Sequence, residues 1–294
     1  MKPIPPIIAG IDFSASSSMV LRHAAHAGAL HGAPVIAVHV LSDQLITHWT
    51  ESGGAAQGIE SLESEARERL QKRVADVTPD ADVRIEVCRG RPSVELSRIV
   101  EQHDSRLLVI AANDMTKKHL GLIASRCVRT IPCDVLILRD WQRDDCSKIV
   151  VGTNFSLTSD KVVQRGIELA TAYGAELEIV HVIYPPDQNI WGETLDHDEN
   201  SPLSYAEECR AKAKEKMARS LDAYAPQLAD IHSSSVILES EVPSLALTYH
   251  IQDSGADLAV LGTRVHSKLA GYFMGTNAER LMRDATVSVL AVRV

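Results

Sequence analysis

The chain repeats itself, and this internal duplication constrains the fold more than any other feature of the sequence. The segment "IIAGIDFSASSSMVLRHAAHAGALHGAPVIAVHV", which begins at Ile7, aligns without a gap with "IVVGTNFSLTSDKVVQRGIELATAYGAELEIVHV", which begins at Ile149. Further along, "GRPSVELSRIVEQHDSRLLVIAA" aligns with "EVPSLALTYHIQDSGADLAVLGT", and "GLIASRCVRTIPCDVLILR" with "GTNAERLMRDATVSVLAVR". The offset between the copies grows from 142 to 151 and then to 154 residues, while the order of segments stays the same. Self-similarity of this length indicates one structural unit built twice.

Each copy alternates short apolar runs with amphipathic segments of helical period. Residues 7–11 and 35–41 are apolar and rich in β-branched side chains, as in parallel strands that are covered on both faces. Between them a helical pattern runs to Gly32, a residue type that commonly ends helices. The alternation predicts an α/β fold of two doubly wound domains, each with a parallel sheet flanked by helices. The predicted boundaries are residues 1–140 for the first domain, 141–148 for a polar linker and 149–294 for the second.

Composition excludes several classes of protein. No apolar run approaches the ~20 residues that a membrane-spanning helix needs, and the start "MKPIPPIIAGIDFS" does not resemble a signal peptide. The formal net charge of −9 disfavours a nucleic acid or an anionic membrane as partner. The five cysteines are scattered without a CxxC pair, which favours a reduced, cytoplasmic protein over a disulfide or metal framework.

Three stretches together resemble the universal stress protein family, and specifically its tandem members. They are "GIDFSASS" at the first strand and turn, "HV" at the end of the second strand, and "LAVLGTRVHSKLAGYFMGTNAERLMRDATVSVLAV" near the end of the chain. The resemblance covers nearly the whole chain. It implies an adenine nucleotide alpha hydrolase-like domain with a five-stranded parallel sheet, in which pairs of domains associate through their last strands. ATP-binding members of this family carry a glycine, two residues, a second glycine, nine residues, and a glycine followed by Ser or Thr.

The second copy keeps most of this phosphate loop. Gly262 and Gly275 have the outer spacing, and Val265 stands where the middle glycine is expected, with a side chain that resists a positive φ. Basic side chains in between, such as Lys268, could face phosphates or could be ordinary solvated loop residues. A carboxylate after the first strand recognises the adenosine end in the family, and here that position is Asn154. The implied nucleotide-binding residues of this copy are Thr153, Asn154, Val182, Gly262, Arg264, His266, Gly275, Thr276 and Asn277.

The first copy shows the opposite pattern of loss. Asp12 keeps the carboxylate, and Val40 matches Val182 at the end of the second strand. The loop, however, is three residues shorter, begins with Ala111, and has a leucine after Gly121 where Ser or Thr is expected. We therefore interpret Asp12, Val40 and Gly121 as the remnant of a site that does not bind ATP in the family's manner.

Other groups of polar residues could serve as sites but have plainer explanations. His23 and His26 are three apart on one predicted helix, a spacing that can bind metal, yet nothing nearby in the sequence completes a ligand set. The acidic run 196–200 in the inserted segment 184–205 could bind a cation, or it could be a solvated loop; the insertion could also cover the pocket or form a dimer contact. His39 and His181 recur at one position of both copies, which favours packing or a local hydrogen bond over catalysis. No metal is expected.

The expected function is a cytoplasmic stress-response module whose second domain binds ATP, ADP or a related phosphate ligand. One alternative is an interaction or regulatory protein in which both sites have decayed; a further one is slow ATP hydrolysis. The chain shows no GxSxG, Walker lysine or HExxH motif, so no dedicated catalytic residue is expected. If the last strands, 134–139 and 288–293, pair within the chain, the two copies form an intramolecular pseudo-dimer, to which a homodimer could be added.

Overall fold

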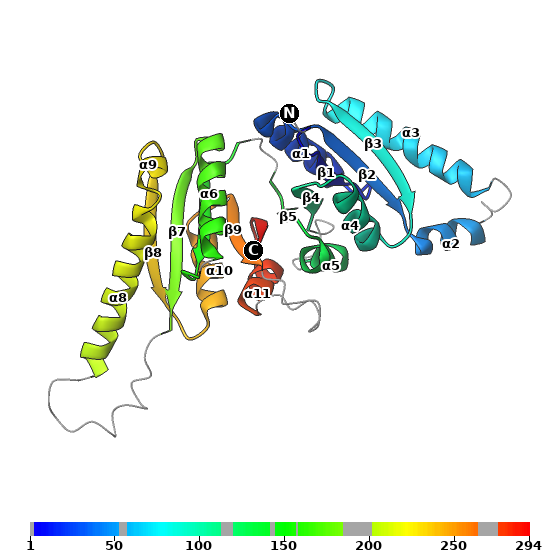
Figure 1. Cartoon of the computed structure of the whole chain (residues 1–294). Helices are drawn as coiled ribbons and strands as arrows, with labels where there is room; N and C mark the ends of the chain where they lie inside the picture. The colour runs from blue at the N-terminus through cyan, green and yellow to red at the C-terminus, as the bar shows by residue number, and fades with distance from the viewer. Residues whose placement is uncertain are drawn as a thin grey trace. The chain divides into compact units, whose positions relative to one another are not determined.

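Alternating strands and helices fill most of the chain, as the duplicated pattern predicts (Figure 1). The computed structural model describes residues 3–52, 58–112, 120–141, 145–156, 158–184, 202–263 and 276–294, with the backbone alone at 202–206 and 276–277. In the first copy the elements are β1 (Ile7–Gly10), α1 (Ser17–His31), β2 (Val35–Leu41), α2 (Asp43–Glu51), α3 (Ile59–Val77), β3 (Val83–Arg89), α4 (Pro92–Gln102), β4 (Leu107–Ala111), α5 (Leu122–Thr130) and β5 (Asp134–Leu138). In the second they are β6 (Lys148–Thr153), α6 (Ser159–Tyr173), β7 (Glu176–Ile183), α8 (Pro202–Asp222), α9 (Ala225–Leu228), β8 (Ser233–Glu239), α10 (Pro243–Asp253), β9 (Leu258–Thr263), α11 (Thr276–Asp284) and β10 (Ser288–Arg293).

The first copy forms a parallel sheet in the order β3-β2-β1-β4-β5. Helices α1 and α3 pack against one another and against β1, β2 and β3, while α4 and α5 form a second pair that packs on β1, β2 and β5. Strands β1, β2, β4 and β5 are mostly buried, whereas the edge strand β3 is partly exposed. The strand order reverses direction between β1 and β4. This is the doubly wound arrangement that the sequence predicts.

The second copy repeats the arrangement with the parallel order β8-β7-β6-β9. Helices α6 and α8 contact β6, β7 and β8, and α10 pairs with α11 while it packs on β7 and β8. Chain contacts divide the described residues into two units, and β10, the last strand of the second copy, belongs to the unit of the first copy.

Strand β10 lies antiparallel to β5, as the sequence predicts for the last strands of the two copies. Leu290 stands opposite Leu136 in the register. Two side chains fasten the ends of the pair: Asp134 accepts a hydrogen bond from the backbone N–H of Arg293 at 2.9 Å, and Ser288 accepts one from the N–H of Arg139 at 3.0 Å. An antiparallel pair covers the edge that β5 would otherwise expose to other chains.

Equivalent glycines perform the same task in both copies. Gly32 and Gly174 follow α1 and α6 in the left-handed conformation, with φ of 60° and 64°. Only glycine adopts this conformation without strain, and it lets the chain turn from the helix into the next strand.

No helix in the described ranges is both long and apolar enough to cross a membrane.

Candidate functional site

The carboxyl edge of the second copy's sheet gathers the predicted site residues that the structure describes. Thr153 ends β6 and Asn154 follows it, while Gly262 is the penultimate residue of β9, the parallel neighbour of β6. Val182 lies on β7, one residue beyond the register partner of Thr153. In open parallel sheets ligands bind at this edge, where the strand order reverses.

The rest of the predicted phosphate loop lies outside the described residues. Arg264, His266 and Gly275 belong to that group, as do Val265 and Lys268. Helix α11 begins at Thr276, so Thr276 and Asn277 occupy its first turn, although nothing is described of their side chains. The predicted helix start after the loop is therefore present.

Gly262 has a packing reason to be glycine as well as a predicted binding one. A Cβ added to it would lie 3.0 Å from Cγ2 of Val162 on α6, which is tighter than an ordinary contact. The glycine at this position thus lets α6 approach β9.

A network of serines fixes the turn after β6. Oδ1 of Asn154 accepts hydrogen bonds from the backbone N–H of Ser156 at 3.1 Å and from the hydroxyl of Ser159 at 2.6 Å. Ser159, at the start of α6, in turn accepts one from the N–H of Asn154 at 3.3 Å. The turn and the first residue of α6 are therefore linked through the side chain of Asn154.

Phe155 in this turn has a conformation that is unusual for a bulky residue. Its φ is 54°, in the left-handed region, at a cost of about 1–3 kcal/mol that the surroundings must offset. The phenyl ring packs on the imidazole of His181 with centroids 4.3 Å apart, and Nζ of Lys216 on α8 stands 5.3 Å from the ring centroid. Aromatic and cation–π contacts of this kind hold the ring in place.

His181 connects the turn to the neighbouring strand. Its Nδ1–H donates to the carbonyl oxygen of Thr153 at 2.8 Å, and because a carbonyl only accepts, this bond places the proton of the neutral ring on Nδ1. Burial lowers the pKa of His181, the hydrogen bond to Thr153 opposes that shift, and the nearby Lys216 adds to it. His181 is thus a neutral hydrogen-bond donor that supports the turn.

The first copy contains the same assembly. Asp12 Oδ1 accepts from the N–H of Ser14 at 2.9 Å and the hydroxyl of Ser17 at 3.1 Å. Phe13 has a φ of 61°, and the centroid of its ring lies 4.2 Å from that of His39. The guanidinium carbon of Arg69, on α3, lies 4.5 Å from the centroid of the Phe13 ring.

His39 Nδ1–H donates to the carbonyl oxygen of Ile11 at 2.7 Å. Its pKa is lowered mainly by burial, against the hydrogen bond to Ile11 and the charge of Asp12. The prediction that His39 and His181 have a local hydrogen-bonding role is confirmed.

At the phosphate end of the first copy, one backbone amide bonds within the chain. The N–H of Gly121 donates to the carbonyl oxygen of Ala112 at 2.7 Å, so this amide is occupied. The next residue, Leu122, begins α5 with its side chain 64% exposed and offers no hydroxyl. Val40 is buried in β2 beside Cys88 of β3, and does not differ from a core residue. Of the three residues in the predicted remnant, Asp12 is the one with a polar side chain.

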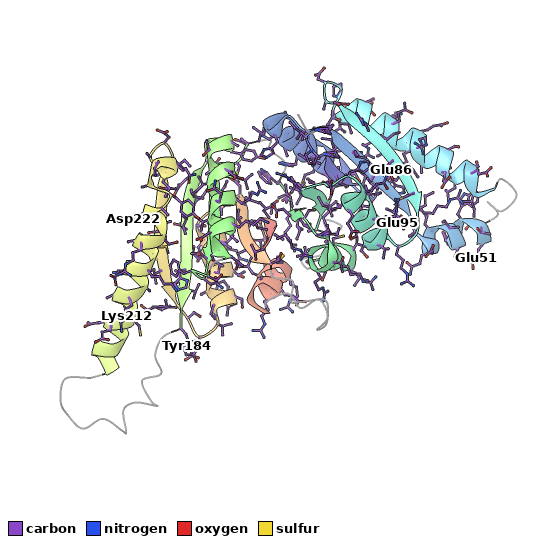
Figure 2. All side chains as sticks on the ribbon, viewed as in Figure 1. Glu51, Glu86, Glu95, Tyr184, Lys212 and Asp222 are labelled. Atoms are coloured by element: carbon purple, nitrogen blue, oxygen red, sulfur yellow. The ribbon has the colours of Figure 1, made fainter. Side chains whose placement is uncertain are left out.

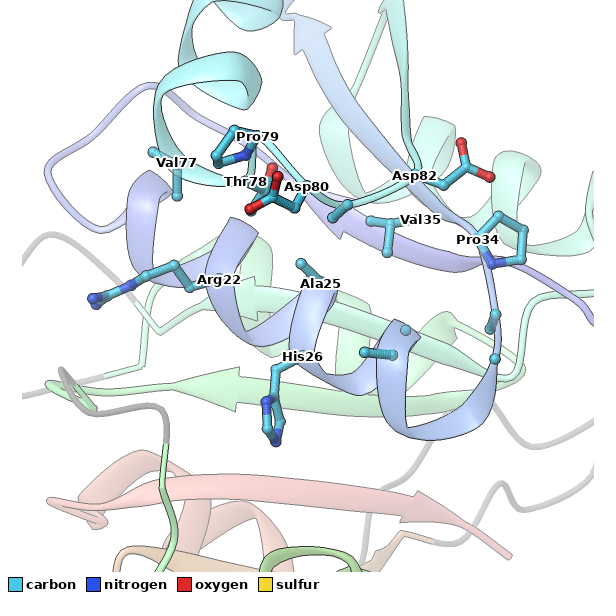
Figure 3. A pocket seen from close by; sticks show the side chains of 15 residues that line it. Arg22, Ala25, His26, Pro34, Val35, Val77, Thr78, Pro79, Asp80 and Asp82 are labelled. Atoms are coloured by element: carbon cyan, nitrogen blue, oxygen red, sulfur yellow. The ribbon is translucent and has the colours of Figure 1, made fainter.

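The predicted alternative sites have structural explanations where they are described. His23 is almost completely buried, and its Nε2 lies 2.9 Å from the carbonyl oxygen of Trp141, on whose ring it also packs. His26 lies beside a groove of about 820 Å³ between α1 and the turn that follows α3, and Figure 3 shows its imidazole directed away from that turn. Within the described ranges no three His, Cys, Asp or Glu residues form a group that could hold a metal ion.

The acidic run 196–200 lies outside the described residues. Tyr184, the residue that follows β7, is 61% exposed (Figure 2).

Two features of the site were missed by the sequence analysis. One is the left-handed Phe13 and Phe155, and the other is the cation over each ring, Arg69 and Lys216. The phenylalanines had a signal, since they are identical at aligned positions of the two copies. The cations had none, because they come from helices far along the chain.

Comparison with known proteins gives a consistent picture of the whole chain. The sequence model described as "Universal stress protein family" matches residues 4–139 and again residues 146–293. A curated universal stress protein of Mycolicibacterium smegmatis is 25% identical over 300 residues, which cover 98% of this chain and 96% of the relative.

Among solved structures, a universal stress protein from Archaeoglobus fulgidus has a TM-score of 0.67 at 18% identity, covering 98% of both chains. A protein of unknown function from Pseudomonas aeruginosa has a TM-score of 0.68 at 16% identity, covering 99% of this chain and 92% of its own. Likeness at such low identity concerns the fold alone.

Proposed function

The chain belongs to the universal stress protein family as a tandem member, and from this premise we propose that its second repeat binds an adenine nucleotide or a related phosphate ligand. In this proposal the protein is a stress-response binding module and not a dedicated enzyme. The first repeat has a structural role, and the domains extend over residues 1–140 and 149–294 with the linker 141–148 between them.

The observation that carries the proposal is the difference between the two phosphate ends. In the first repeat the amide of Gly121 is bonded to Ala112 and the helix begins with an exposed leucine. In the second repeat Gly262 is the penultimate residue of strand β9, and helix α11 begins with Thr276, a residue type whose hydroxyl and helix-start amides suit a phosphate. The glycine–threonine pair at 275–276, against Gly121 followed by Leu122 in the first repeat, supports binding in the second repeat.

Calorimetric titration with ATP tests the proposal. Gly275→Val adds a branched side chain where the backbone must approach the phosphates, so we expect a loss of affinity of at least about tenfold. Gly121→Val is the matched control, because the amide of Gly121 already bonds to Ala112 and is not part of the proposed site. Equal affinity of both variants, or no heat of binding for the wild type, would contradict the proposal.

A second candidate function is an interaction protein with two decayed sites. It is favoured by Val265 in the phosphate loop and by Asn154 in place of a carboxylate. Native mass spectrometry of freshly purified protein separates the two, since a retained nucleotide is incompatible with two empty sites. Slow ATP hydrolysis is a lesser candidate, for which phosphate release would have to exceed that of a Thr276→Ala variant.

Two further parts of the proposal concern assembly and location. The pairing of β5 with β10 supports the proposal that the two repeats form an intramolecular pseudo-dimer. Whether two chains also form a homodimer is tested by measuring the mass of the protein in solution. A cytoplasmic location is supported by the cysteines, because none of those in the described structure forms a disulfide.

A further inference from the structure

A small cluster of charged and polar side chains joins strands β6 and β7 to helix α10 in the second repeat. Because a carboxylate only accepts hydrogen bonds, Nε2–H of His250, on α10, donates to Oε2 of Glu178, on β7, at 2.6 Å. Nζ of Lys148, on β6, stands 3.7 Å from the other oxygen of Glu178 and 3.3 Å from Oε1 of Glu176. Glu178 is only 7% exposed, so its carboxylate has lost most of its contact with water and depends on these partners.

The first repeat has an apolar residue at every position that aligns with this cluster. In the place of Lys148, Glu176, Glu178 and His250 it has, in that order, Pro6, Pro34, Ile36 and Ile99. Ile36 on β2 and Ile99 on α4 are 6% and 0% exposed, and these two elements are in contact. One repeat therefore joins its sheet to this helix through isoleucines, and the other through a carboxylate and an imidazole.

Two copies of one fold in a single chain can assemble incorrectly, because equivalent elements compete for the same place. Misassembly between similar units is a characteristic failure of multidomain and repeat proteins. Helices α4 and α10 are such a pair, since each has 11 residues and begins with a proline. Length and helix start do not distinguish them, so the distinction has to come from the side chains that face the sheet.

A helix packed on the wrong sheet would bring unlike side chains together. On the second sheet, α4 would place Ile99 against Glu178, whose carboxylate would lose its hydrogen-bond donor in a site with little water. On the first sheet, α10 would place His250 against Ile36 in the position where a carboxylate is needed. Removing one partner of a buried pair is strongly destabilising, whereas replacing both partners by apolar residues is often neutral or stabilising. The cluster therefore contributes more to discrimination between helices than to stability.

We propose that the Glu178–His250 pair, supported by Lys148, makes the β6–β7 face of the second repeat accept helix α10 and reject helix α4. The apolar pair of Ile36 and Ile99 gives the first repeat the opposite preference. A buried polar residue that fixes register and partner in a coiled coil acts by the same physics. The inference concerns the assembly of the two repeats and does not depend on nucleotide binding.

A double-mutant cycle in the full chain tests the discrimination. His250→Ile puts the residue of α4 against Glu178, and Glu178→Ile puts the residue of the first sheet against His250, so each single variant reproduces one wrong contact. The double variant reproduces the apolar pair of the first repeat. Hydrogen exchange followed by mass spectrometry measures the protection of the α10 peptides, with the α4 peptides as internal reference. We expect each single variant to lose at least about tenfold in protection, and the double variant to return to within about threefold of the wild type.

Refolding of the same double variant tests the consequence for assembly. With isoleucine pairs in both repeats, α4 and α10 fit either sheet, so the double variant should refold less well although it is as stable as the wild type. After dilution from denaturant, the fraction recovered as monomer with native hydrogen exchange should fall by at least about twofold. His250→Gln is the matched control, because its amide NH2 donates to Glu178 and keeps a polar partner on α10; it should refold like the wild type.

The outcomes distinguish discrimination from simple stabilisation. If the double variant loses as much protection as the two single variants together, the pair only stabilises the repeat and the inference is wrong. It is also wrong if the single variants keep wild-type protection, because a wrong contact then costs nothing, or if the double variant refolds as well as the wild type. A single variant that fails to fold counts as a loss of protection, and the double variant then decides.

Discussion

Gly166 and Val151 form a size-matched pair whose disruption should be measurable. Gly166, in the middle of α6, faces β6 so closely that an added Cβ would lie 2.3 Å from Cγ2 of Val151. An ordinary carbon–carbon contact needs about 3.5 Å, and the β-branched Val151 cannot rotate freely to make room. At the aligned positions the first repeat has Ala24 and Ala9, both completely buried. The first repeat therefore pairs two alanines here, whereas the second pairs a glycine with a valine.

Gly166→Ala should therefore destabilise the second repeat although alanine is the better helix former. Overpacking costs about 1–3 kcal/mol, and a contact this short belongs near the upper end. Higher helix propensity returns about 1 kcal/mol. The expected net loss is about 2 kcal/mol, or about 4–8 °C in the thermal midpoint of a domain of this size.

The double variant Val151→Ala with Gly166→Ala recreates the pair of the first repeat. Because the new methyl group enters the space left by the valine, the double variant should be less destabilised than the two single changes together, with a coupling of about 1–2 kcal/mol. Hydrogen exchange followed by mass spectrometry measures this in the α6 peptides, and the α1 peptides serve as an internal reference. Additive losses, or a Gly166→Ala variant that is more stable than the wild type, would refute the reasoning.

Three further predictions concern single groups. Burial lowers the pKa of His181 below 6.5, so its contribution to stability should be complete above that pH and be lost as the pH falls through the lowered value; His181→Gln should remove this part of the pH dependence of unfolding. Burial raises the pKa of Cys127 and Cys133 to about 12, so a thiol reagent at pH 8 should leave both unmodified until the protein unfolds, and early labelling would contradict their burial. The Arg210–Glu239 ion pair is 45% and 34% exposed, and Glu239→Ala should lower the free energy of unfolding by no more than about 1 kcal/mol, as denaturant titration can check.

The duplication made the fold predictable from the sequence. Aligned short apolar runs rich in β-branched residues form β1 and β6, and the aligned glycines 32 and 174 end α1 and α6 in the left-handed conformation. The pairing of β5 with β10 also followed, from the resemblance to a family whose domains associate through their last strands. Local patterns and a repeated order carry this information because they act within a few residues.

The site was only partly predictable, because its geometry depends on contacts between distant residues. The sequence predicted that Asn154 follows the first strand of the second copy. It did not predict that Ser156 and Ser159 donate hydrogen bonds to the side-chain oxygen of Asn154. Lys216 approaches Phe155 from a helix more than 60 positions later in the chain, a contact that no spacing indicates. Gly262 was expected for a phosphate, and the structure adds a packing reason that the sequence could not contain.

The stoichiometry of nucleotide binding tests the central claim most directly. Native mass spectrometry of the full chain with ATP should show one nucleotide per chain, because only the second repeat combines Gly262 with a helix that begins at Thr276. Gly275→Val should reduce the bound fraction, and Gly121→Val should leave it unchanged. Two nucleotides per chain, or none at saturating concentration, would contradict the account.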